Sequence, residues 1–460
     1  MLLMTLIIVA VVLFGFILMT TEQAHHINRA TIAMVSGVAA WVIYMVNGGQ
    51  FVQLMHQSDY ASFMSSGMSS SDSIKYFISE HVITRYIIEA CSVILFLIAT
   101  NTIVEVLHNN GVFDSLMSWL RMRGSRKFLW TISILTFVIS ANVDNLTTVV
   151  LMMSFVANIV RNHYQRVIYA SAIIVSACMG GCFTAIGDMT SVMLWVRGLI
   201  TPSTYAAGLF LPAIAVLCTF NLLIGSMLHG RVEIYSVLTR YDGNDSSWAA
   251  WQKVVLLVLG IAGLWFIPSF HFITKLPPFL GSLSVLALIW AVEGIFNLEK
   301  NGNVLLVQRH YFRNAEFISI RIILYFLGIT LGVGALAECG ALDFVGRWLE
   351  SNINNVYIYG VAVGLLSSIL DNVPLMMSCM NMFPLDTVPE STSEFVQNGI
   401  YWQLLSFCCA CGGTLLFVGT LAGQAVLEVE KIRFRWYIRN FLWRALAAWA
   451  VGLGVFWLTH

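Results

Sequence analysis

Charged residues are scarce in this sequence. Lys, Arg, Asp and Glu make up 10% of its 460 residues, against about 25% in ordinary soluble domains. The 24 basic residues balance the 24 acidic ones, so net charge gives no reason to expect a nucleic-acid partner. Hydrophobic residues make up 58%. This composition predicts an all-α polytopic membrane protein that lies in a lipid bilayer.

Familiar enzyme motifs are also missing. There is no H-E-x-x-H pair, P-loop, Rossmann glycine run or Ser-His-Asp order. The nine cysteines lie mostly in apolar segments, and the group at Cys408, Cys409 and Cys411 has no second Cys or His pair at zinc-finger spacing. We therefore expect no enzymatic activity and no cofactor.

Long apolar runs dominate what is present. Residues 2–20 lack the basic start and cleavage site of a signal peptide, so we expect them to stay as a membrane span. Residues 51–80 are rich in Ser and Met, and we expect them to form an exposed polar loop. Windows of about 20 apolar residues predict ten crossings, near residues 2–20, 30–46, 84–107, 167–196, 205–228, 254–270, 276–296, 318–336, 401–426 and 436–458.

A polar stretch, Ser140-Ala-Asn-Val-Asp-Asn-Leu-Thr-Thr148, separates two apolar arms at 128–139 and 149–159. Each arm is too short to cross a hydrocarbon core that needs roughly 20 helical residues. We therefore predict a re-entrant helical hairpin whose polar tip lies at membrane depth. Irregular backbone survives there only where it is buried in protein or lines a cavity, so the tip is a candidate binding site. The alternative is a loop between two core helices of a soluble protein.

The second half of the chain repeats the landmarks of the first. Asp144-Asn145 recurs as Asp371-Asn372, and Gly180-Gly181 with Gly187 recurs as Gly412-Gly413 with Gly419, in the same order and at nearly the same offset. An odd number of crossings separates the copies, which predicts inverted repeats, as in secondary transporters. The expected parts are N-terminal helices with a loop (1–83), a first repeat (84–228, hairpin 128–160, broken helix 167–198), connecting helices (229–317) and a second repeat (318–460, hairpin 356–383, broken helix 400–430).

Each hairpin is followed by a helix that glycines are expected to break. Glycines can let the backbone leave the helix and free its carbonyls for a cation, although they also permit close helix packing. Asp188, Thr190 and Ser191 add hard oxygen ligands to the first break, and such ligands suit an alkali cation or a proton.

Three acidic residues, Asp144, Asp188 and Asp371, are the strongest candidates for function. A carboxylate near the bilayer centre costs at least ~2.5–3.5 kcal/mol unless a partner or water relieves it, and the sequence places no basic residue in or beside these elements. Competition between a cation and a proton for the same oxygens is therefore expected, with Na⁺ held by Asp144, Asn145 and Asp188. The full predicted ion site is Asp144, Asn145, Thr147, Thr148, Asp188, Thr190, Ser191, Asp371 and Asn372, supported by Ser140, Asn142, Ser367, Gly180, Gly181, Gly187, Gly412, Gly413, Thr414 and Glu89.

Other ionisable residues are weaker candidates. Glu89 lies four residues after Arg85, so a local ion pair competes with a place on a proton path. Glu105 and Glu293 lie near the ends of apolar segments and can reach the membrane interface. Basic residues give the orientation, because 19 of the 24 fall on one predicted face, Arg29 included. That face is expected to be cytoplasmic, which leaves both termini on the opposite side.

These motifs, together with Ile103-Val-Glu105, Leu370-Asp-Asn-Val-Pro374 and Glu430-Lys-Ile-Arg-Phe-Arg-Trp-Tyr437, resemble those of the NhaD-type sodium/proton antiporters of the ion transporter superfamily. The resemblance runs from about Thr84 to the C-terminus. It implies exchange of Na⁺ or Li⁺ for H⁺ across the bacterial inner membrane at alkaline pH, a role in pH homeostasis, and a homodimer with a scaffold half and a moving half. It also implies a role for Glu89 in activity. The sequence departs from the family at Thr184-Ala185, where the family has proline, and at Ser191, where it has threonine.

Two rival functions stay open. An anion, arsenite or dicarboxylate permease has the same fold, but it needs positive or neutral groups toward its substrate. An intramembrane aspartyl protease also uses two membrane aspartates, but Ala185 stands where such an enzyme needs glycine, and the duplicated hairpins have no role in proteolysis.

Overall fold

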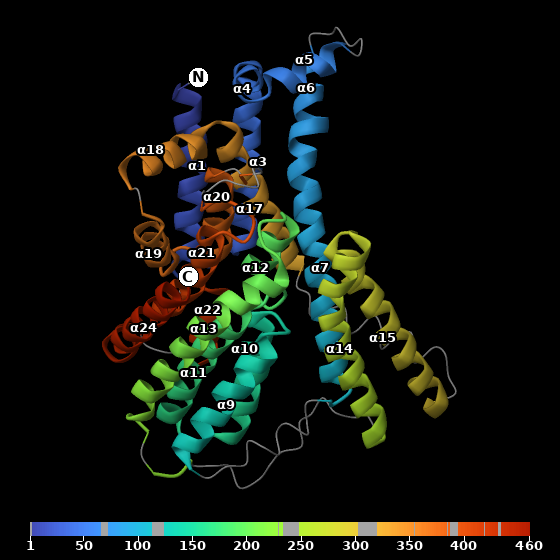
Figure 1. The fold of residues 1–460 in the computed structure, drawn as a ribbon, viewed down its shortest axis with the longest axis vertical. Coiled ribbons are helices and arrows are strands. Elements are labelled where there is room, and N and C mark those ends of the chain that lie inside the picture. Colours follow the sequence, from blue (N-terminus) through green and yellow to red (C-terminus); the bar gives the residue numbers. More distant parts are fainter. Residues whose placement is uncertain are drawn as a thin grey trace.

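A computed structural model describes residues 2–460 except 66–71, 113–123, 229, 233–247, 302–319, 354, 384, 387–393, 418 and 431–433. The described residues form helices and no β-strand (Figure 1). The basic segments 121–127, 231–253, 300–321 and 431–444, on which much of the predicted orientation depends, fall partly outside them, as does Ser69–Ser73.

Ten helical segments are long and apolar enough to cross a membrane, which agrees with the predicted number. They are Leu2–Thr20 (α1), Arg29–Val46 (α3), Ser73–Asn109 (α6, η1 and α7), His163–Cys182 (α11), Pro202–Gly225 (α13), Trp251–Thr274 (in α14), Pro278–Asn297 (in α15), Ile320–Glu338 (α17), Ile400–Leu427 (α21 and most of α22) and Arg435–Thr459 (α23, η2 and α24).

The two hairpins are pairs of shorter helices. The first consists of α9 (Ser125–Ser140) and α10 (Asn145–Ile159), and the second of α19 (Val356–Ser367) and α20 (Asn372–Met382). The broken helices are α11 with α12 (Met189–Val196) and α21 (Ile400–Leu416) with α22 (Leu421–Glu430). The predicted fold class, all-α with two repeats that each hold a hairpin and a broken helix, is confirmed.

Equivalent residues of the two repeats have similar backbone conformations and positions. The helices that begin the repeats, α7 (Thr84–Asn109) and α17, are each followed by a glycine of positive φ, Gly111 and Gly340, as is usual past a helix end. Between the repeats, Cys411 Sγ lies 3.7 Å from Met179 Sδ. These two residues have the same 232-residue offset as Gly180 and Gly412, so their contact marks the axis that relates the repeats.

Further helices surround the repeats. α3 packs closely on α17, where Gly37 and Gly328 leave no room for side chains. α14 (Ala250–Thr274) and α15 (Pro278–Asn301) pack on each other and on α7, at the right of Figure 1. α18 (Ala341–Asn352) joins α17 to the second hairpin. The long α7 packs on the α14–α15 pair on one side and on α12 and α17 on the other (Figure 1).

The prediction of a loop at 51–80 is wrong, whereas the predicted exposure holds for much of the described part, such as most of residues 53–64. The described part of this segment is mostly helical: α4 (Gly48–Met55), α5 (Gln57–Ser65), α6 (Ser73–Phe77) and η1 (Ile78–Ile83); a short helix, α2 (Glu22–His25), also links α1 to α3. Phe51 is buried and stacks on Tyr44 of α3 at 4.8 Å between ring centroids. Apolar contacts of this kind hold α4 against the membrane helices despite the polar composition of the segment.

Candidate functional site

The first hairpin tip is held together from within. Asp144 caps α10, and its carboxylate accepts a hydrogen bond from the backbone N–H of Leu146 at 3.1 Å. Ser140 Oγ lies 2.8 Å from Asn145 Oδ1 and 2.8 Å from the carbonyl oxygen of Ala177 on α11. The tip is therefore fastened to the broken helix through Ser140 and Asn145, while Asp144 stands at the positive end of a short helix.

Glycines bring the broken helix against this tip. A Cβ atom at Gly180 would meet the carbonyl of Phe137, one at Gly181 would meet the Asn145 amide, and one at Gly187 would meet the carbonyl of Ser140. Gly180 and Gly181 lie inside α11, whose last residue is Cys182. The prediction that these two glycines break the helix is wrong, because they serve close packing and the break follows them.

The break itself covers residues 183–188. Thr184 Oγ1 donates to the Ala141 carbonyl at 2.7 Å and accepts from the Gly187 N–H at 3.0 Å, so it ties the break to the hairpin tip. Asp188 is the N-cap residue of α12, and its carboxylate accepts a hydrogen bond from Thr190 Oγ1 at 2.6 Å. Ser191 Oγ donates to the Asp188 carbonyl at 2.8 Å.

The structure brings the predicted ion ligands of the first hairpin tip and those of the first helix break together. The carboxyl groups of Asp144 and Asp188 lie close enough to interact electrostatically, and both side chains are buried. Thr148 Oγ1 is buried and has no hydrogen-bond partner in the described part of the chain. Thr147 Oγ1 is 3.4 Å from Asn101 Oδ1 on α7. Carboxylate and hydroxyl oxygens from α10 and α12 thus converge at two helix N-termini.

The second hairpin repeats the fastening of the first. Ser367 Oγ lies 2.6 Å from the side-chain amide of Asn372 and 2.8 Å from the Cys409 carbonyl. Side chains at Gly412 and Gly413 would meet Gly364 and Asn372 respectively, as in the first repeat. Thr414 donates to its own helix, to the Cys411 carbonyl at 2.7 Å.

Asp371 differs from Asp144 in its partners. The hydroxyl of Tyr325 on α17 donates a hydrogen bond to the Asp371 carboxylate. Arg29 lines the same small cavity, of about 10 Å³, as Tyr325 and Asp371. Arg29 is buried and pairs with Glu22 at 2.7 Å. The prediction that no basic residue lies beside the three aspartates is therefore wrong for Asp371.

The first tip faces a much larger cavity, of about 250 Å³. It lies between α7 and α10, and its described lining contains no lysine or arginine. The polar lining residues are Asn101, Glu105, His108, Asn109, Asp144, Thr147 and Ser154. The difference in volume separates the two tips: Asp144 has room for water or a hydrated ion, and Asp371 has almost none.

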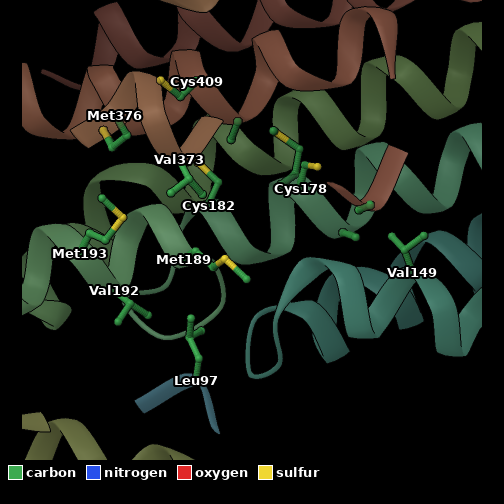
Figure 2. Close-up of a cluster of buried hydrophobic side chains, with 14 of the residues drawn as sticks. Leu97, Val149, Cys178, Cys182, Met189, Val192, Met193, Val373, Met376 and Cys409 are labelled. Carbon is green, nitrogen blue, oxygen red and sulfur yellow. The ribbon is translucent and has the colours of Figure 1, made fainter. Parts of the chain in front are cut away.

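Apolar side chains from both repeats seal the region around the breaks (Figure 2). Cys178 and Cys182 of α11, Met189 of α12 and Val373 and Met376 of α20 are all at most 4% exposed. The polar groups at the break, Asp188, Thr190 and Ser191, therefore lie in surroundings of low dielectric, which strengthens interactions between charges.

Two other predicted residues have definite partners. Glu89 forms an ion pair with Arg197, whose Nη2 lies 3.0 Å from Glu89 Oε2. Its ion-pair partner is therefore not Arg85, which the sequence offered as one of two alternatives. Asn142 Oδ1 accepts a hydrogen bond from the Trp265 indole of α14 at 2.6 Å. Glu89 thus joins α7 to the end of α12, and Asn142 joins the first tip to α14.

Sequence reasoning missed three residues of this region. Tyr325 and Arg29 left no signal that links them to Asp371, because the contacts are long-range. Asn101 lies within the predicted span 84–107, and a polar side chain inside a membrane span is itself a signal of function.

Comparisons with known proteins agree with this architecture. A family model described as citrate transporter matches residues 1–405. Sodium/proton antiporter 2 of Arabidopsis thaliana is 29% identical over 97% of this chain and 97% of its own length. The Na⁺/H⁺ antiporter NhaD of Vibrio parahaemolyticus is 27% identical over 87% of this chain and 93% of its own.

One more relative and one solved structure are also similar to this chain. Sodium/proton antiporter 1 of Arabidopsis thaliana is 32% identical over 81% of this chain, which spans only 62% of that relative. A crystal structure of the YdaH transporter of Alcanivorax borkumensis, described as having an unusual topology, superposes with a TM-score of 0.55 over 85% of this chain and 89% of its own, at 13% identity. The resemblance to NhaD-type proteins is confirmed, and the chain belongs to the citrate transporter family of the ion transporter superfamily.

Proposed function

We propose that this protein is a secondary transporter that exchanges Na⁺ or Li⁺ for H⁺. The observation that carries the proposal is the asymmetry of the two tips: Asp144 opens onto a cavity of about 250 Å³ without lysine or arginine in its described lining, whereas Asp371 is bonded by Tyr325. Relatives over most of the chain are named sodium/proton antiporters.

In this mechanism one site serves both ions. Asp144, Asn145, Thr147, Thr148 and Asp188 supply oxygen ligands of the kind that alkali cations prefer. Two interacting carboxylates favour a bound positive charge, whether it is a sodium ion or a proton. Binding of Na⁺ then releases protons and binding of protons releases Na⁺. Asp371 and Asn372 hold the second tip in shape, and Thr190 and Ser191 orient Asp188.

Exposure of the site to the two sides requires one group of helices to move against another. The cavity lies where α10 meets α7, so we assign the hairpins and broken helices to the moving group and α7, α14 and α15 to the scaffold. We expect the protein to act in the bacterial inner membrane as a homodimer, with both termini away from the cytoplasm and with a role in pH homeostasis.

The rival function is transport of citrate or another anion, which the family description suggests. Two carboxyl groups, Asp144 and Glu105, face the cavity. Their negative charge disfavours an anionic substrate and favours a cation.

The test is proton flux in inverted membrane vesicles after addition of Na⁺, Li⁺ or K⁺, with citrate uptake as a second arm. We expect Na⁺ or Li⁺ to drive proton release, and Asp144→Asn and Asp188→Asn each to abolish it. The control Asp72→Asn changes an exposed carboxylate paired with Lys75 and should leave the flux unchanged. Citrate uptake that survives Asp144→Asn, without any cation response in the wild type, would contradict the proposal.

A further inference from the structure

Glu105 lines the cavity beside Asp144 but is not among the proposed ion ligands. It is 8% exposed, and the side chain of Asn109, one turn further along α7, is a hydrogen-bond partner of its carboxyl group. A buried carboxylate without a described Lys or Arg partner is costly. Its position near a helix end led us to expect that it reaches the membrane interface. The structure instead buries it against α15.

A second carboxyl group faces it. Glu293 of α15 is 3% exposed and interacts electrostatically with Glu105. Its Oε1 accepts a hydrogen bond from Asn110 Nδ2 at 2.9 Å, and its Oε2 has no partner in the described part of the chain. Two neighbouring carboxyl groups without a described Lys or Arg partner favour the uptake of a proton by one of them.

The cavity connects this pair to the ion site. Glu105 and Asp144 line the same space, which continues past His108 and Asn109 to the end of α7. From Asn101 to Asn109 the lining covers about 12 Å of helix. A volume of about 250 Å³ holds several water molecules, because one needs roughly 10–15 Å³. Protons can therefore pass between the Glu105 and Asp144 carboxyl groups along a chain of water molecules.

From this geometry, and resting on the proposed exchange function, we infer that Glu105 is a proton-relay residue between Asp144 and the face at which α7 ends. When a cation binds, the proton of the Asp144 carboxyl passes through cavity water to the Glu105 carboxylate. Glu105 then releases it to water at the end of α7, and uptake follows the reverse order. The groups that face Glu105 and influence this step are Asn101, His108 and Asn109 on α7, Glu293 on α15 and Asp144 on α10.

The test compares Glu105→Gln and Glu105→Asp with Glu293→Gln, which also removes a buried carboxyl from the same helix pair but does not line the cavity. Purified proteins that retain the wild-type elution profile are assayed for Na⁺-driven proton flux across the pH range. For Glu105→Gln we expect the maximal rate to fall at least about tenfold, a changed pH profile, and a KM for Na⁺ within about twofold of wild type. Glu105→Asp should recover part of the rate. Glu293→Gln removes a negative charge beside Glu105 but leaves the relay carboxyl in place, so it should keep the maximal rate and shift the pH profile to lower pH.

A second measurement does not depend on transport. A carbodiimide reacts with protonated carboxyl groups in apolar surroundings, and mass spectrometry locates the modified residue. We expect Glu105 to be labelled at low pH and the labelling to disappear as the pH rises. Labelling that is absent or independent of pH, an unchanged pH profile in Glu105→Gln, or equal loss of rate in Glu293→Gln would overturn the relay. A wild-type protein without cation-driven flux would instead refute the proposed function, while the labelling still decides whether Glu105 takes up a proton.

Discussion

At the scale of single residues, the two aspartates at the hairpin tips have different partners. Asp144 accepts a backbone N–H and faces open space, whereas Asp371 accepts the Tyr325 hydroxyl in a confined one. The same Asp-Asn pair is thus free for an ion in one repeat and bound to protein in the other. Asp188 adds to this difference, because Thr420 takes its place in the second repeat and accepts the N–H of Gly423 at 3.0 Å.

Substitution of Tyr325 by Phe tests the structural role of Asp371. The change removes the hydroxyl donor and leaves a buried carboxylate with one partner fewer, which should lower the free energy of unfolding by about 1–3 kcal/mol. The lower stability should appear as a reduced unfolding temperature in detergent, with little change in the KM for Na⁺. Tyr44→Phe is the matched control, since the buried Tyr44 hydroxyl has no described partner. Equal stability of the two variants would argue against the role of Tyr325.

At the scale of elements, each broken helix can pack closely on its hairpin because the contact positions are glycines, which have no side chain. The same three glycine positions approach the hairpin in each repeat, so the two elements of a repeat form a single packed unit. Thr184 adds a hydrogen bond from the break to the tip of the first hairpin.

Gly181→Ala should damage this unit. Its Cβ would collide with the Asn145 amide, and overpacking of this kind typically costs about 1–3 kcal/mol. We expect a lower unfolding temperature and slower Na⁺-driven proton flux. Gly454→Ala on α24 (Trp443–Thr459) is the control, because a Cβ there meets nothing within 4 Å. That change should be neutral or stabilise the helix by up to about 1 kcal/mol. Wild-type behaviour of Gly181→Ala would contradict the packing argument.

A polar contact links the end of α4 to the end of α17. His56 Nε2 lies 2.6 Å from Glu338 Oε2, and the Tyr86 hydroxyl donates to Glu338 Oε1 at 2.8 Å. The hydrogen bond to Glu338 raises the pKa of His56 above its ordinary value, with a smaller contribution from Asp59. A raised pKa in the folded state means that the protonated pair stabilises the fold fully below the unfolded pKa, near 6.5. That stability is lost as pH rises through the folded pKa.

The wild type should therefore unfold at a higher temperature than His56→Asn at pH 5 to 6, and the difference should shrink as the medium becomes alkaline. Thermal unfolding in detergent at a series of pH values measures it. In a Glu338→Gln background the same His56→Asn change should produce little pH-dependent difference. A difference that stays constant with pH, or that survives the loss of Glu338, would show that the contact does not act as an ion pair.

At the scale of the whole molecule, orientation in the membrane follows from charge. Basic residues favour the cytoplasmic side of short loops, and 19 of 24 were assigned to one face from sequence. Arg29 leaves that set because it is buried beside Asp371, yet the remaining majority still predicts the same orientation.

A fusion of alkaline phosphatase to His460 should accordingly be active, and a fusion of green fluorescent protein at the same place should be dark. The same reporters placed after Asn301, at the end of α15, should give the opposite pattern. Fluorescence from the fusion at His460 would reverse the proposed orientation and the side at which the cavity of Glu105 opens.

Much of the fold followed from the sequence alone. Ten crossings and two hairpins could be predicted because lipid forces the backbone to satisfy its hydrogen bonds within helices, so apolar run length translates directly into structure. The repeats were visible because landmark residues recur in order. The candidate aspartates were found because carboxylates are rare at membrane depth, and their role as an ion site stays a prediction.

Only the tertiary structure decided how these residues differ. The partners of Asp371 and Glu89 come from helices far away in the chain, Tyr325 from α17 and Arg197 from the end of α12. The cavity beside Asp144 and the burial of Glu105 depend on how α7, α10 and α15 pack. Composition and spacing carry no record of such contacts, because side-chain partners and empty volume arise only when separate helices are brought together.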